Sequence, residues 1–245
     1  MRNIRLLLEY DGTDFHGWQR QPDVRTVQGA METAVRNTFG QRTEVIGAGR
    51  TDRGVHAQGY VCNFHVDTDL EPERIVAALR AHLDKDVVVK KAIDAPPDFH
   101  ARFDAVSRCY VYRLDTVPTA IHRRIHHVIK YQLDVSAMDR AACLLRGEHD
   151  FTSFTRSGSA ADPTCQVLDT SVTAEGPGVS ITVEANRFLH NMVRIIAGTL
   201  IDVGRGRMDP EQITEVLCRK DRTAAGPTAP PCGLVLVAVR YPGEG

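Results

Sequence analysis

The sequence predicts an α+β fold built from two ferredoxin-like units, each with the element order β-α-β-β-α-β. Apolar residues alternate in some segments, which indicates strands, and recur every three or four residues in others, which indicates helices. The same order of segments occurs in both halves of the chain. We therefore expect an N-terminal unit at residues 1–104 and a C-terminal unit at residues 105–245, with joined antiparallel sheets and a central cleft.

The first half contains four expected strands and two expected helices. Thr26 can begin the first helix, because its hydroxyl can accept a hydrogen bond from the first turn, and Gly40 can end it in the left-handed conformation. Pro72 fits the first turn of the second helix, where its missing N–H is not needed. The expected strands are at residues 3–10, 43–46, 60–66 and 87–91, and the expected helices are at residues 26–39 and from Pro72 through Leu83.

The second half repeats this plan. Ser136 and Asp139 are expected to form a capping pair, with Gly147 at the end of the helix that they begin. The last strand is apolar on both faces, which predicts a place inside a sheet. The other expected elements are strands at residues 108–114, 166–173, 179–185 and 234–239, helices at residues 189–203 and from Asp209-Pro210 onward, and loops at residues 157–163 and 223–231.

Composition and charge limit the class of protein. The chain is 42% hydrophobic and 25% charged, which is ordinary for a globular protein, and no apolar run reaches the roughly 18 residues that a membrane span needs. We therefore expect a cytoplasmic protein without a membrane partner. The net charge of -1 excludes a uniformly basic nucleic-acid binder but allows a local basic cleft. The six cysteines form no paired motif, so neither disulfides nor a metal site is expected.

The most informative segment covers residues 49–57. It places one carboxylate, Asp52, between Arg50 and Arg53, with a glycine on either side of the three. Arginine suits bidentate contacts with phosphate, and glycine allows a sharp turn or a close approach to a ligand. This arrangement indicates chemistry on a nucleotide. The alternative is a surface turn with a local ion pair, a common feature that contributes little.

Arg194 is expected on a helix that is apolar on most of its surface. Its polar neighbours His190 and Asn191 lie on the same side of that helix. A buried arginine needs a partner, and Asp52 across the cleft is the functional candidate. Such a pair would keep Asp52 ionised, because a nearby positive charge favours the carboxylate. A structural salt bridge is the alternative.

Aromatic and basic side chains supply further candidates. Tyr110 and Tyr112 share one face of a strand, where a tyrosine can stack on a nucleobase or simply belong to the core. His100 and Arg102 share another face and could bind phosphate. Residues 122–127 are basic, but their histidines match no metal-binding motif, so we expect a solvated surface or, second, a surface that faces RNA. The chain has no P-loop, GxGxxG, GxSxG or HExxH motif.

Taken together, these residues closely resemble the TruA family of tRNA pseudouridine synthases, which act on tRNA positions 38–40. The resemblance covers nearly the whole chain and keeps the order of the motifs. They are YDGT (residues 10–13), GWQ (17–19), GRTDRGVHA (49–57), FHARF (99–103), Tyr110, FTSF (151–154), FLHNMVR (188–194) and Gly233-Leu234.

The resemblance implies roles for particular residues. Asp52 is then the catalytic aspartate, Arg194 its ion-pair partner, and Tyr110 the tyrosine that packs on the target base. Arg50 is similar to the arginine that holds the flipped nucleotide. Further substrate contacts are expected from Arg53, His56, Arg102 and Leu234.

The implied reaction isomerises uridine to pseudouridine in the tRNA anticodon stem-loop, by an enzyme that acts as a homodimer. No electron or external group enters this reaction, so we expect no cofactor and no metal. Two alternatives stay open: a pseudouridine synthase with another RNA specificity, and a non-catalytic RNA-binding protein.

Overall fold

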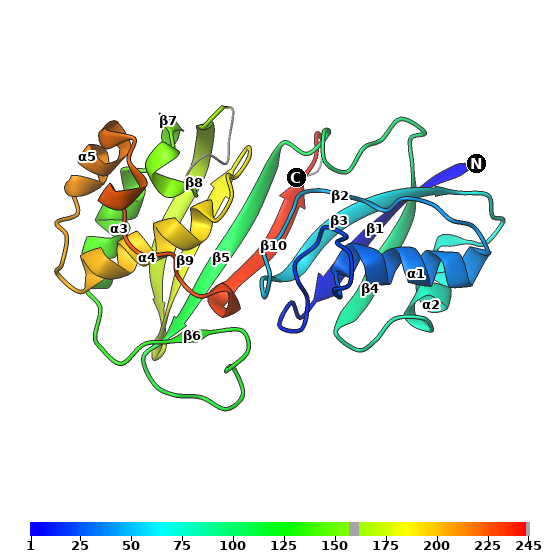
Figure 1. Cartoon of the computed structure of the whole chain (residues 1–245), viewed down its shortest axis with the longest axis horizontal. Helices are drawn as coiled ribbons and strands as arrows, with labels where there is room; N and C mark the ends of the chain where they lie inside the picture. The colour runs from blue at the N-terminus through cyan, green and yellow to red at the C-terminus, as the bar shows by residue number, and fades with distance from the viewer. Residues whose placement is uncertain (157–161, 244–245) are drawn as a thin grey trace. The chain divides into compact units, whose positions relative to one another are not determined.

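The computed structural model describes residues 1–156 and 162–243, which form a mixed α+β protein with mostly antiparallel strand pairing (Figure 1). Two compact units are present. The first consists of Met1–Val106 with Leu236–Gly245, and the second of Ser107–Val235. None of the described helices is long and apolar enough to cross a membrane.

The first unit contains a sheet in the strand order β4-β1-β3-β10, with β2 beside β3. β1 pairs antiparallel with both β3 and β4, and β2 pairs antiparallel with β3. α2 packs against β4 and α1. The elements are β1 (Arg2–Tyr10), α1 (Val27–Phe39), β2 (Ile46–Gly47), β3 (His56–Val66), α2 (Pro72–Arg80), β4 (Val87–Ala95) and β10 (Leu234–Arg240), whose first two residues belong to the second unit.

The core of this unit joins one face of the sheet to the apolar sides of the helices. Its fully buried members include Leu6 and Leu8 of β1, Met31 of α1, Phe64 of β3 and Leu79 of α2. Burying a side chain of this size stabilises a fold by about 1.5–3 kcal/mol relative to leaving it exposed. The alternation that predicted the strands therefore reflects real burial.

The helix signals of the first half are confirmed. The Thr26 hydroxyl accepts a hydrogen bond from the Gly29 amide at 3.3 Å, and Gly40 has a φ of 68° at the end of α1. Pro72 is the first residue of α2. α2 ends at Arg80, however, so Leu83 lies outside it.

Two strand predictions of the first half were inaccurate. β3 begins at His56 instead of near residue 60, and both of its faces are buried for most of its length, which hides the alternation. β2 is only two residues long, because it pairs with no more of β3 than Cys62 and Asn63.

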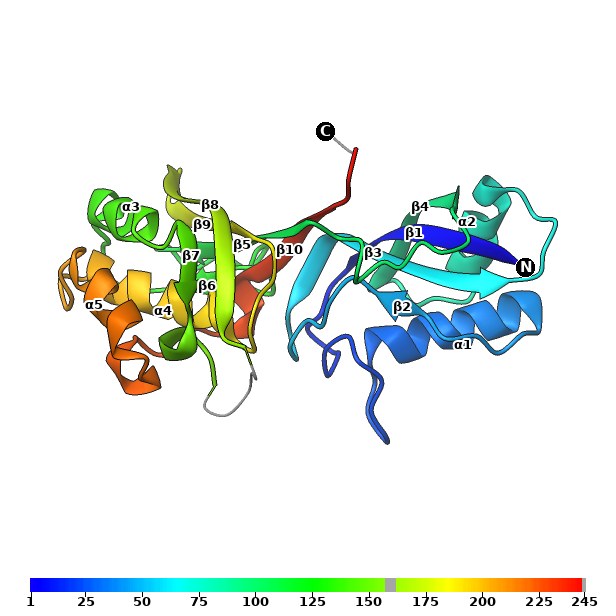
Figure 2. The same ribbon diagram turned by 90° about the horizontal axis from the view of Figure 1, so that it is seen from above.

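The second unit has the strand order β5-β9-β8-β7, and all of these neighbours pair antiparallel. Figure 2 shows β7, β8 and β9 side by side. α3 packs against β8 and α4. The elements are β5 (Ser107–Asp115), β6 (His127–Val128), α3 (Val135–Cys143), β7 (Gly147–Asp150), β8 (Thr164–Glu175), β9 (Gly178–Ala185), α4 (Met192–Gly204) and α5 (Gln212–Arg219), with short 3₁₀ turns at Thr152–Phe154, Arg222–Ala224 and Pro231–Gly233.

The predicted cap of α3 is wrong. Asp134 caps this helix, and its carboxylate accepts a hydrogen bond from the Ala137 amide at 2.9 Å. Ser136 already lies inside the helix. Asp139 accepts a hydrogen bond from the Val172 amide at 2.8 Å and so links α3 to β8. Gly147 begins β7 with a φ of 105° and does not end α3.

The remaining predictions of the second half need small changes. β6 and β7 were not predicted, because each is short and neither has an alternating apolar pattern. α4 begins at Met192, and α5 begins at Gln212, two residues after the predicted Asp209-Pro210 start. The predicted loop at residues 223–231 is irregular apart from short 3₁₀ turns at its two ends. Residues 157–161 of the other predicted loop lie outside the described residues.

Candidate functional site

Asp52 lies in the connection between β2 and β3, as predicted, and is half-buried. The Val55 amide donates a hydrogen bond to the Asp52 carbonyl oxygen at 3.1 Å, which closes a tight turn. Gly54 has a φ of 78° in this turn, a conformation that glycine adopts without strain. The turn fixes the backbone from which the Asp52 side chain projects.

A second segment, residues 11–18, holds this turn in place; we call it the clamping loop. The Trp18 amide donates to the Thr51 carbonyl oxygen at 3.1 Å, and the Gly54 amide donates to the Phe15 carbonyl oxygen at 3.2 Å. Just before the loop, the Tyr10 and Thr51 hydroxyls share a buried hydrogen bond of 2.9 Å. The backbone on both sides of Asp52 is therefore bonded to distant residues.

The two backbones approach closely at glycines of the clamping loop. A Cβ at Gly17 would lie 2.5 Å from the Thr51 carbonyl oxygen, and Gly17 has a φ of 88°. A Cβ at Gly12 would collide with the carbonyl oxygen of Val55. The YDGT and GWQ motifs thus have a structural purpose that the sequence did not reveal: their glycines let the clamping loop touch the Asp52 turn.

An aromatic group supports the start of the Asp52 segment. The rings of Trp18 and Tyr60 stack with centroids 4.1 Å apart, and the Tyr10 ring lies 5.6 Å from Tyr60. The Tyr60 hydroxyl donates a short hydrogen bond to the Gly49 carbonyl oxygen. These contacts join residues 10, 18, 49 and 60 into one rigid platform.

His56 is almost fully buried, with 3% of its surface exposed. Its Nδ1 accepts a hydrogen bond from the Gly12 amide at 3.1 Å and also lies 3.1 Å from the Asp11 carboxylate. One nitrogen cannot accept from an amide and donate to a carboxylate at once. We favour acceptance from Gly12, because the nearby Asp11 oxygen already accepts hydrogen bonds from both the amide and the hydroxyl of Thr13. These contacts fix the clamping loop, and the predicted substrate contact of His56 stays a prediction.

Arg50, Arg53 and Arg102 are exposed in the first unit, so their guanidinium groups are accessible to a charged ligand. The Arg102 guanidinium lies 5.6 Å from the Phe103 ring centroid. His100, which the sequence grouped with Arg102 as a phosphate ligand, instead accepts hydrogen bonds from the backbone amides of residues 102 and 103. His100 therefore shapes the local turn.

In the second unit, Arg194 lies in the first turn of α4 and is half-buried. Its Nε donates to the Ala229 carbonyl oxygen at 2.8 Å, and its Nη1 donates to the Asn191 side-chain oxygen at 2.9 Å. Asn191 directly precedes the helix with a φ of 63°. The orientation of the guanidinium is thus set by residues of its own unit. The sequence placed Asn191 near Arg194 but did not predict that it positions the arginine.

Tyr110 and Tyr112 share one face of β5, as predicted, but differ in their surroundings. Tyr112 is completely buried, and its hydroxyl donates to the Pro230 carbonyl oxygen at 2.9 Å. Burial raises the pKa of this hydroxyl above its usual range. Tyr110 keeps 9% of its surface exposed and meets the Phe188 ring edge-on at 5.1 Å. Tyr112 is therefore a core residue, whereas Tyr110 lies at the margin of the core.

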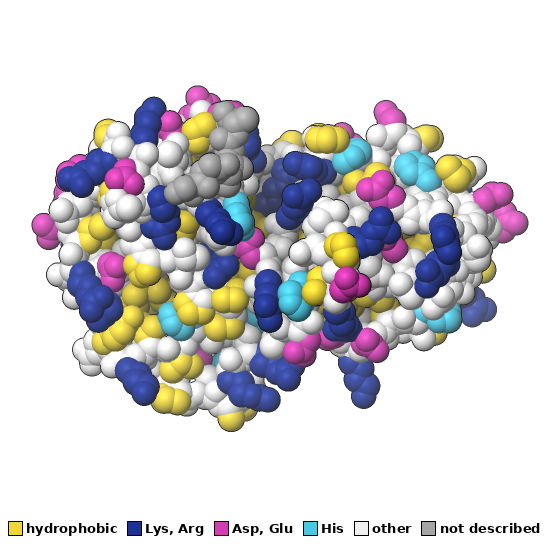
Figure 3. Space-filling view, in the orientation of Figure 1, with side chains coloured by type: hydrophobic (Ala, Val, Ile, Leu, Met, Phe, Trp, Pro, Cys, Tyr) yellow, Lys and Arg dark blue, Asp and Glu magenta, His cyan; other side chains and the backbone are white. Residues whose placement is uncertain are grey.

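The predicted site residues are divided between the units. The first unit carries Asp52 and the basic residues around it, and the second carries Tyr110, Arg194 and Leu234, a buried residue that begins β10. The pairing of Asp52 with Arg194 stays a prediction. On the face of the protein shown in Figure 3, basic and acidic side chains are interspersed, in keeping with the small net charge.

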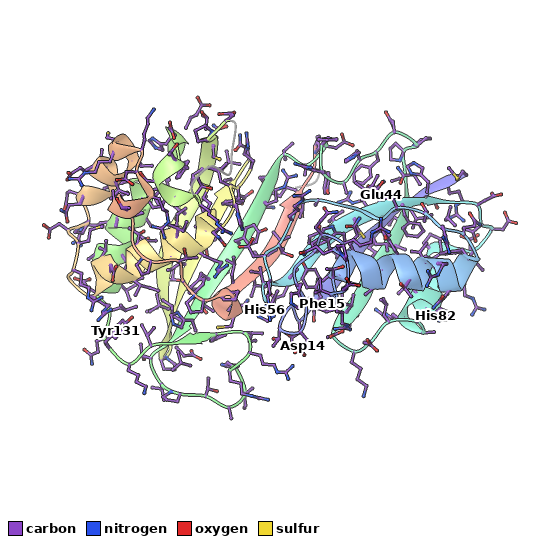
Figure 4. All side chains as sticks on the ribbon, in the orientation of Figure 1. Asp14, Phe15, Glu44, His56, His82 and Tyr131 are labelled. Atoms are coloured by element: carbon purple, nitrogen blue, oxygen red, sulfur yellow. The ribbon has the colours of Figure 1, made fainter. Side chains whose placement is uncertain are left out.

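A groove of about 940 Å³ runs along α1 but includes none of the predicted site residues. Its walls are mostly polar and include Gln28, Arg36, Glu44 and His82. Figure 4 labels Glu44 and His82 there, while His56 and Phe15 mark the region of the clamping loop. Small-molecule sites are mostly apolar with few polar groups, so this groove does not replace Asp52 as the candidate site.

Possible metal ligands form a separate group. Among the described residues, Asp115, His122 and His126 bring three ligand atoms within 4.8 Å of one another. None of them is a predicted site residue, and all belong to the second unit.

Comparisons with known proteins agree with the motifs. A family model described as tRNA pseudouridine synthase matches residues 7–104 and 141–242, which include Asp52 and Arg194 but not Tyr110. The protein named tRNA pseudouridine synthase A from Caldicellulosiruptor bescii is 43% identical over 244 residues, covering 98% of this chain and 100% of that protein. The protein of the same name from Chloroflexus aurantiacus is 46% identical over 249 residues, covering 99% of this chain and 90% of that protein. A solved Cbf5-Nop10-Gar1 complex has 11% identity, covers 83% of this chain and 55% of the matched chain, and has a TM-score of 0.34, too low to carry an argument.

Proposed function

Because this chain belongs to the tRNA pseudouridine synthase family, we propose that it isomerises uridine to pseudouridine in tRNA, with Asp52 as the catalytic carboxylate. One structural observation carries the assignment of Asp52. It is a half-buried carboxylate in a turn whose backbone is bonded on both sides to the clamping loop, and exposed arginines lie next to it in the chain. A reacting group must be held in one geometry, and this turn meets that requirement.

The reaction places clear demands on the site. The N1–C1′ bond of uridine breaks, the uracil turns, and C5 bonds to C1′; the proton lost from C5 is balanced by the one gained at N1. The base cannot turn inside a helical stack, so the nucleotide must be flipped out. Asp52 then either attacks C1′ or C6, or removes the C2′ proton. We propose that Tyr110 packs on the detached base and that Arg50 holds the flipped nucleotide.

Arg194 is proposed as the ion-pair partner that keeps Asp52 ionised. Its guanidinium is already oriented by Asn191 and Ala229, so little of its side-chain freedom is lost when it meets a carboxylate. Arg53, His56, Arg102 and Leu234 are proposed as further substrate contacts. His56 is the least accessible of these, because it is almost fully buried.

We also propose that each unit is a ferredoxin-like variant. In the first unit, the strand order β4-β1-β3-β2 with α1 after β1 and α2 after β3 supports this. In the second, α3 follows β5, α4 follows β9, and β9 lies between β5 and β8; β7 is then an addition at the edge. The joined sheets, the central cleft and a functional boundary between residues 104 and 105 belong to the same proposal.

The finer statements about the substrate and assembly rest on the resemblance. We propose positions 38–40 of the anticodon stem-loop as the target, a homodimer as the active form, and the cytoplasm as the place of action. A monomeric mass in light scattering of the purified chain would contradict the dimer.

Tritium release tests the function directly. tRNA carrying tritium at uridine C5 is incubated with purified protein and chelator, using transcripts with uridine at only one of positions 38, 39 or 40. We expect release from the wild type at these positions. Asp52→Asn should lose more than about a thousandfold in turnover, equal to about 4 kcal/mol of transition-state stabilisation, but keep its fold and tRNA binding. The exposed Asp69→Asn is the matched control in the same unit.

The outcomes separate the alternatives. Near-normal turnover of Asp52→Asn would falsify the catalytic assignment. Wild-type protein that binds tRNA without releasing tritium would favour a non-catalytic RNA-binding protein. Release only from uridines in other RNAs would show a synthase of different specificity.

A further inference from the structure

The loop between β5 and β6, residues 116–126, gathers three possible metal ligands at the end of β5 (Figure 1). Asp115 is the last residue of β5, and His122 and His126 lie near the end of the loop. β5 and β6 pair in parallel, with Asp115 opposite Val128, so the loop must return to the strand end where it began. This return brings the two histidines over Asp115.

The three ligand atoms lie within 4.8 Å of one another. The Asp115 Oδ2 atom lies 3.0 Å from His126 Nδ1 and 3.8 Å from His122 Nδ1. The two imidazole rings stack with centroids 4.5 Å apart and an angle of 29° between them. Both histidines therefore present the same nitrogen to the same carboxylate oxygen.

A hydrogen-bonded ion pair does not account for this geometry. The Asp115 side chain is only 8% exposed. Within the described part of the chain, its Oδ2 and the Nδ1 of His126 are buried and make no hydrogen bond, although they lie 3.0 Å apart. Buried polar atoms without hydrogen bonds are costly and rare. Two such atoms that are close but not aligned for a hydrogen bond have the arrangement of ligands aimed at a third atom.

We propose that Asp115, His122 and His126 bind one divalent transition-metal ion, with Zn²⁺ as the best fit. Zinc takes imidazole nitrogen and carboxylate oxygen at about 2.0–2.2 Å, usually in a tetrahedron. Such a tetrahedron separates its ligand atoms by about 3.3 Å, between the 3.0 and 3.8 Å found here. His122 is 49% exposed, so the ion has a path of entry and a water can fill the fourth position.

The site would pin the loop to the end of β5. It lies between the two segments that the family model matches, and it contains no residue of the proposed catalytic set. The same residues correct the sequence-based picture of residues 122–127 as one solvated surface: His122, Arg123 and Arg124 are exposed, but His126 and His127 are half-buried. Spacing within that stretch missed the site because the third ligand, Asp115, lies outside it.

Metal binding to the full-length chain tests the proposal. Protein freed of metal with chelator and then dialysed is titrated with Zn²⁺ by calorimetry and with Co²⁺ by absorption spectroscopy. We expect one ion per chain, a rise in Tm with Zn²⁺, and cobalt d–d bands without a thiolate charge-transfer band. Loss of an outer-shell partner typically weakens metal binding 10–100-fold, so losing a direct ligand in His122→Gln should weaken it at least about tenfold.

The controls make each result decisive. Asp115→Asn tests the buried ligand. If Asp115→Asn fails to fold, His122→Gln tests metal binding instead, because the half-exposed His122 can be replaced with less disturbance to the fold. His149→Gln, which changes a half-buried histidine outside the cluster in the same unit, should bind like the wild type. Wild-type protein without stoichiometric binding, an unchanged affinity in His122→Gln, or a thiolate band from the cysteines would each overturn the proposal. Turnover is not the readout, so the result does not depend on the proposed function.

Discussion

The Asp52 turn of the first unit and the Arg194 helix of the second are held in place by different means. Asp52 lies on a connection whose backbone depends on hydrogen bonds from the clamping loop and on close contact with glycines. Arg194 lies on a helix, which supplies its own backbone hydrogen bonds, so only its side chain needs fixing by Asn191 and Ala229. A functional residue on a loop thus needs a second segment of chain, whereas one on a helix needs only one or two side-chain contacts.

Gly17→Ala should give the largest effect on stability. The new Cβ would lie 2.5 Å from the Thr51 carbonyl oxygen and would occupy a backbone with a φ of 88°. Left-handed strain and overpacking together should cost about 3 kcal/mol, or roughly 8 °C in Tm, and displace the Asp52 turn. Thermal unfolding and tritium release measure both effects.

Gly49→Ala is the matched control for this change. A Cβ at Gly49 would meet nothing within 4 Å, and its φ is not left-handed. Its Tm should stay within about 1 °C of the wild type. Equal destabilisation of both variants would show that close approach at Gly17 does not hold the turn.

Asn191→Gly, next to the Arg194 helix, should lower turnover while leaving stability nearly unchanged. Glycine keeps the left-handed backbone before α4 but removes the oxygen that accepts from Arg194 Nη1. We expect turnover to fall about tenfold, equal to 1.4 kcal/mol, with little change in Tm. Asn191→Ala should lose about 1 kcal/mol more stability from backbone strain. Normal turnover of Asn191→Gly would show that the Asn191 side chain is not needed to orient the arginine.

Tyr10→Phe should produce a smaller change on the loop side. It removes the buried hydrogen bond to the Thr51 hydroxyl, at a cost of about 1 kcal/mol, and should lower turnover several-fold because Thr51 adjoins Asp52. Tyr241→Phe removes a comparable bond, to the Ala101 carbonyl oxygen, in the same unit. It should cost similar stability in thermal unfolding without the loss of turnover. Equal turnover in the two variants would show that the Tyr10 hydrogen bond does not help to position the Asp52 turn.

His127→Gln should have the smallest effect, and the pH-dependent part of that effect should appear only at low pH. Burial lowers the pKa of His127, so the folded chain resists its protonation. The unfolded chain takes up this proton near pH 6.5. The contribution of neutral His127 to the free energy of unfolding is therefore fully present above about pH 6.5 and is lost as the pH falls through the folded pKa. Between pH 7 and pH 5, Tm should fall less in His127→Gln than in the wild type, by about 2 °C at most; parallel curves would contradict this.

Features that depend on near neighbours in the chain could be predicted from the amino-acid sequence. Thr26 lies at the start of α1, Gly40 at its end, and Pro72 at the start of α2. These signals can be recognised in the sequence because a capping residue interacts with backbone groups only a few residues away. The alternating and helical patterns predicted the main strands and helices for the same reason. The motifs were distinctive enough to predict the family, and residues 49–57 placed Asp52 between two strands.

Contacts between groups that are distant in the sequence could be identified only in the folded chain. Ser136 and Asp134 are both residue types that can cap a helix. In the fold, Asp134 has the extended backbone that directly precedes α3. The Asp139 carboxylate is not available to the cap, because it accepts a hydrogen bond from the Val172 amide. Nothing local shows that Gly17 must touch Thr51, that Asn191 orients Arg194, or that Asp115 meets His126. Each of these contacts joins groups whose mutual approach depends on how loops and strands pack, and packing is set by the whole fold instead of by local spacing.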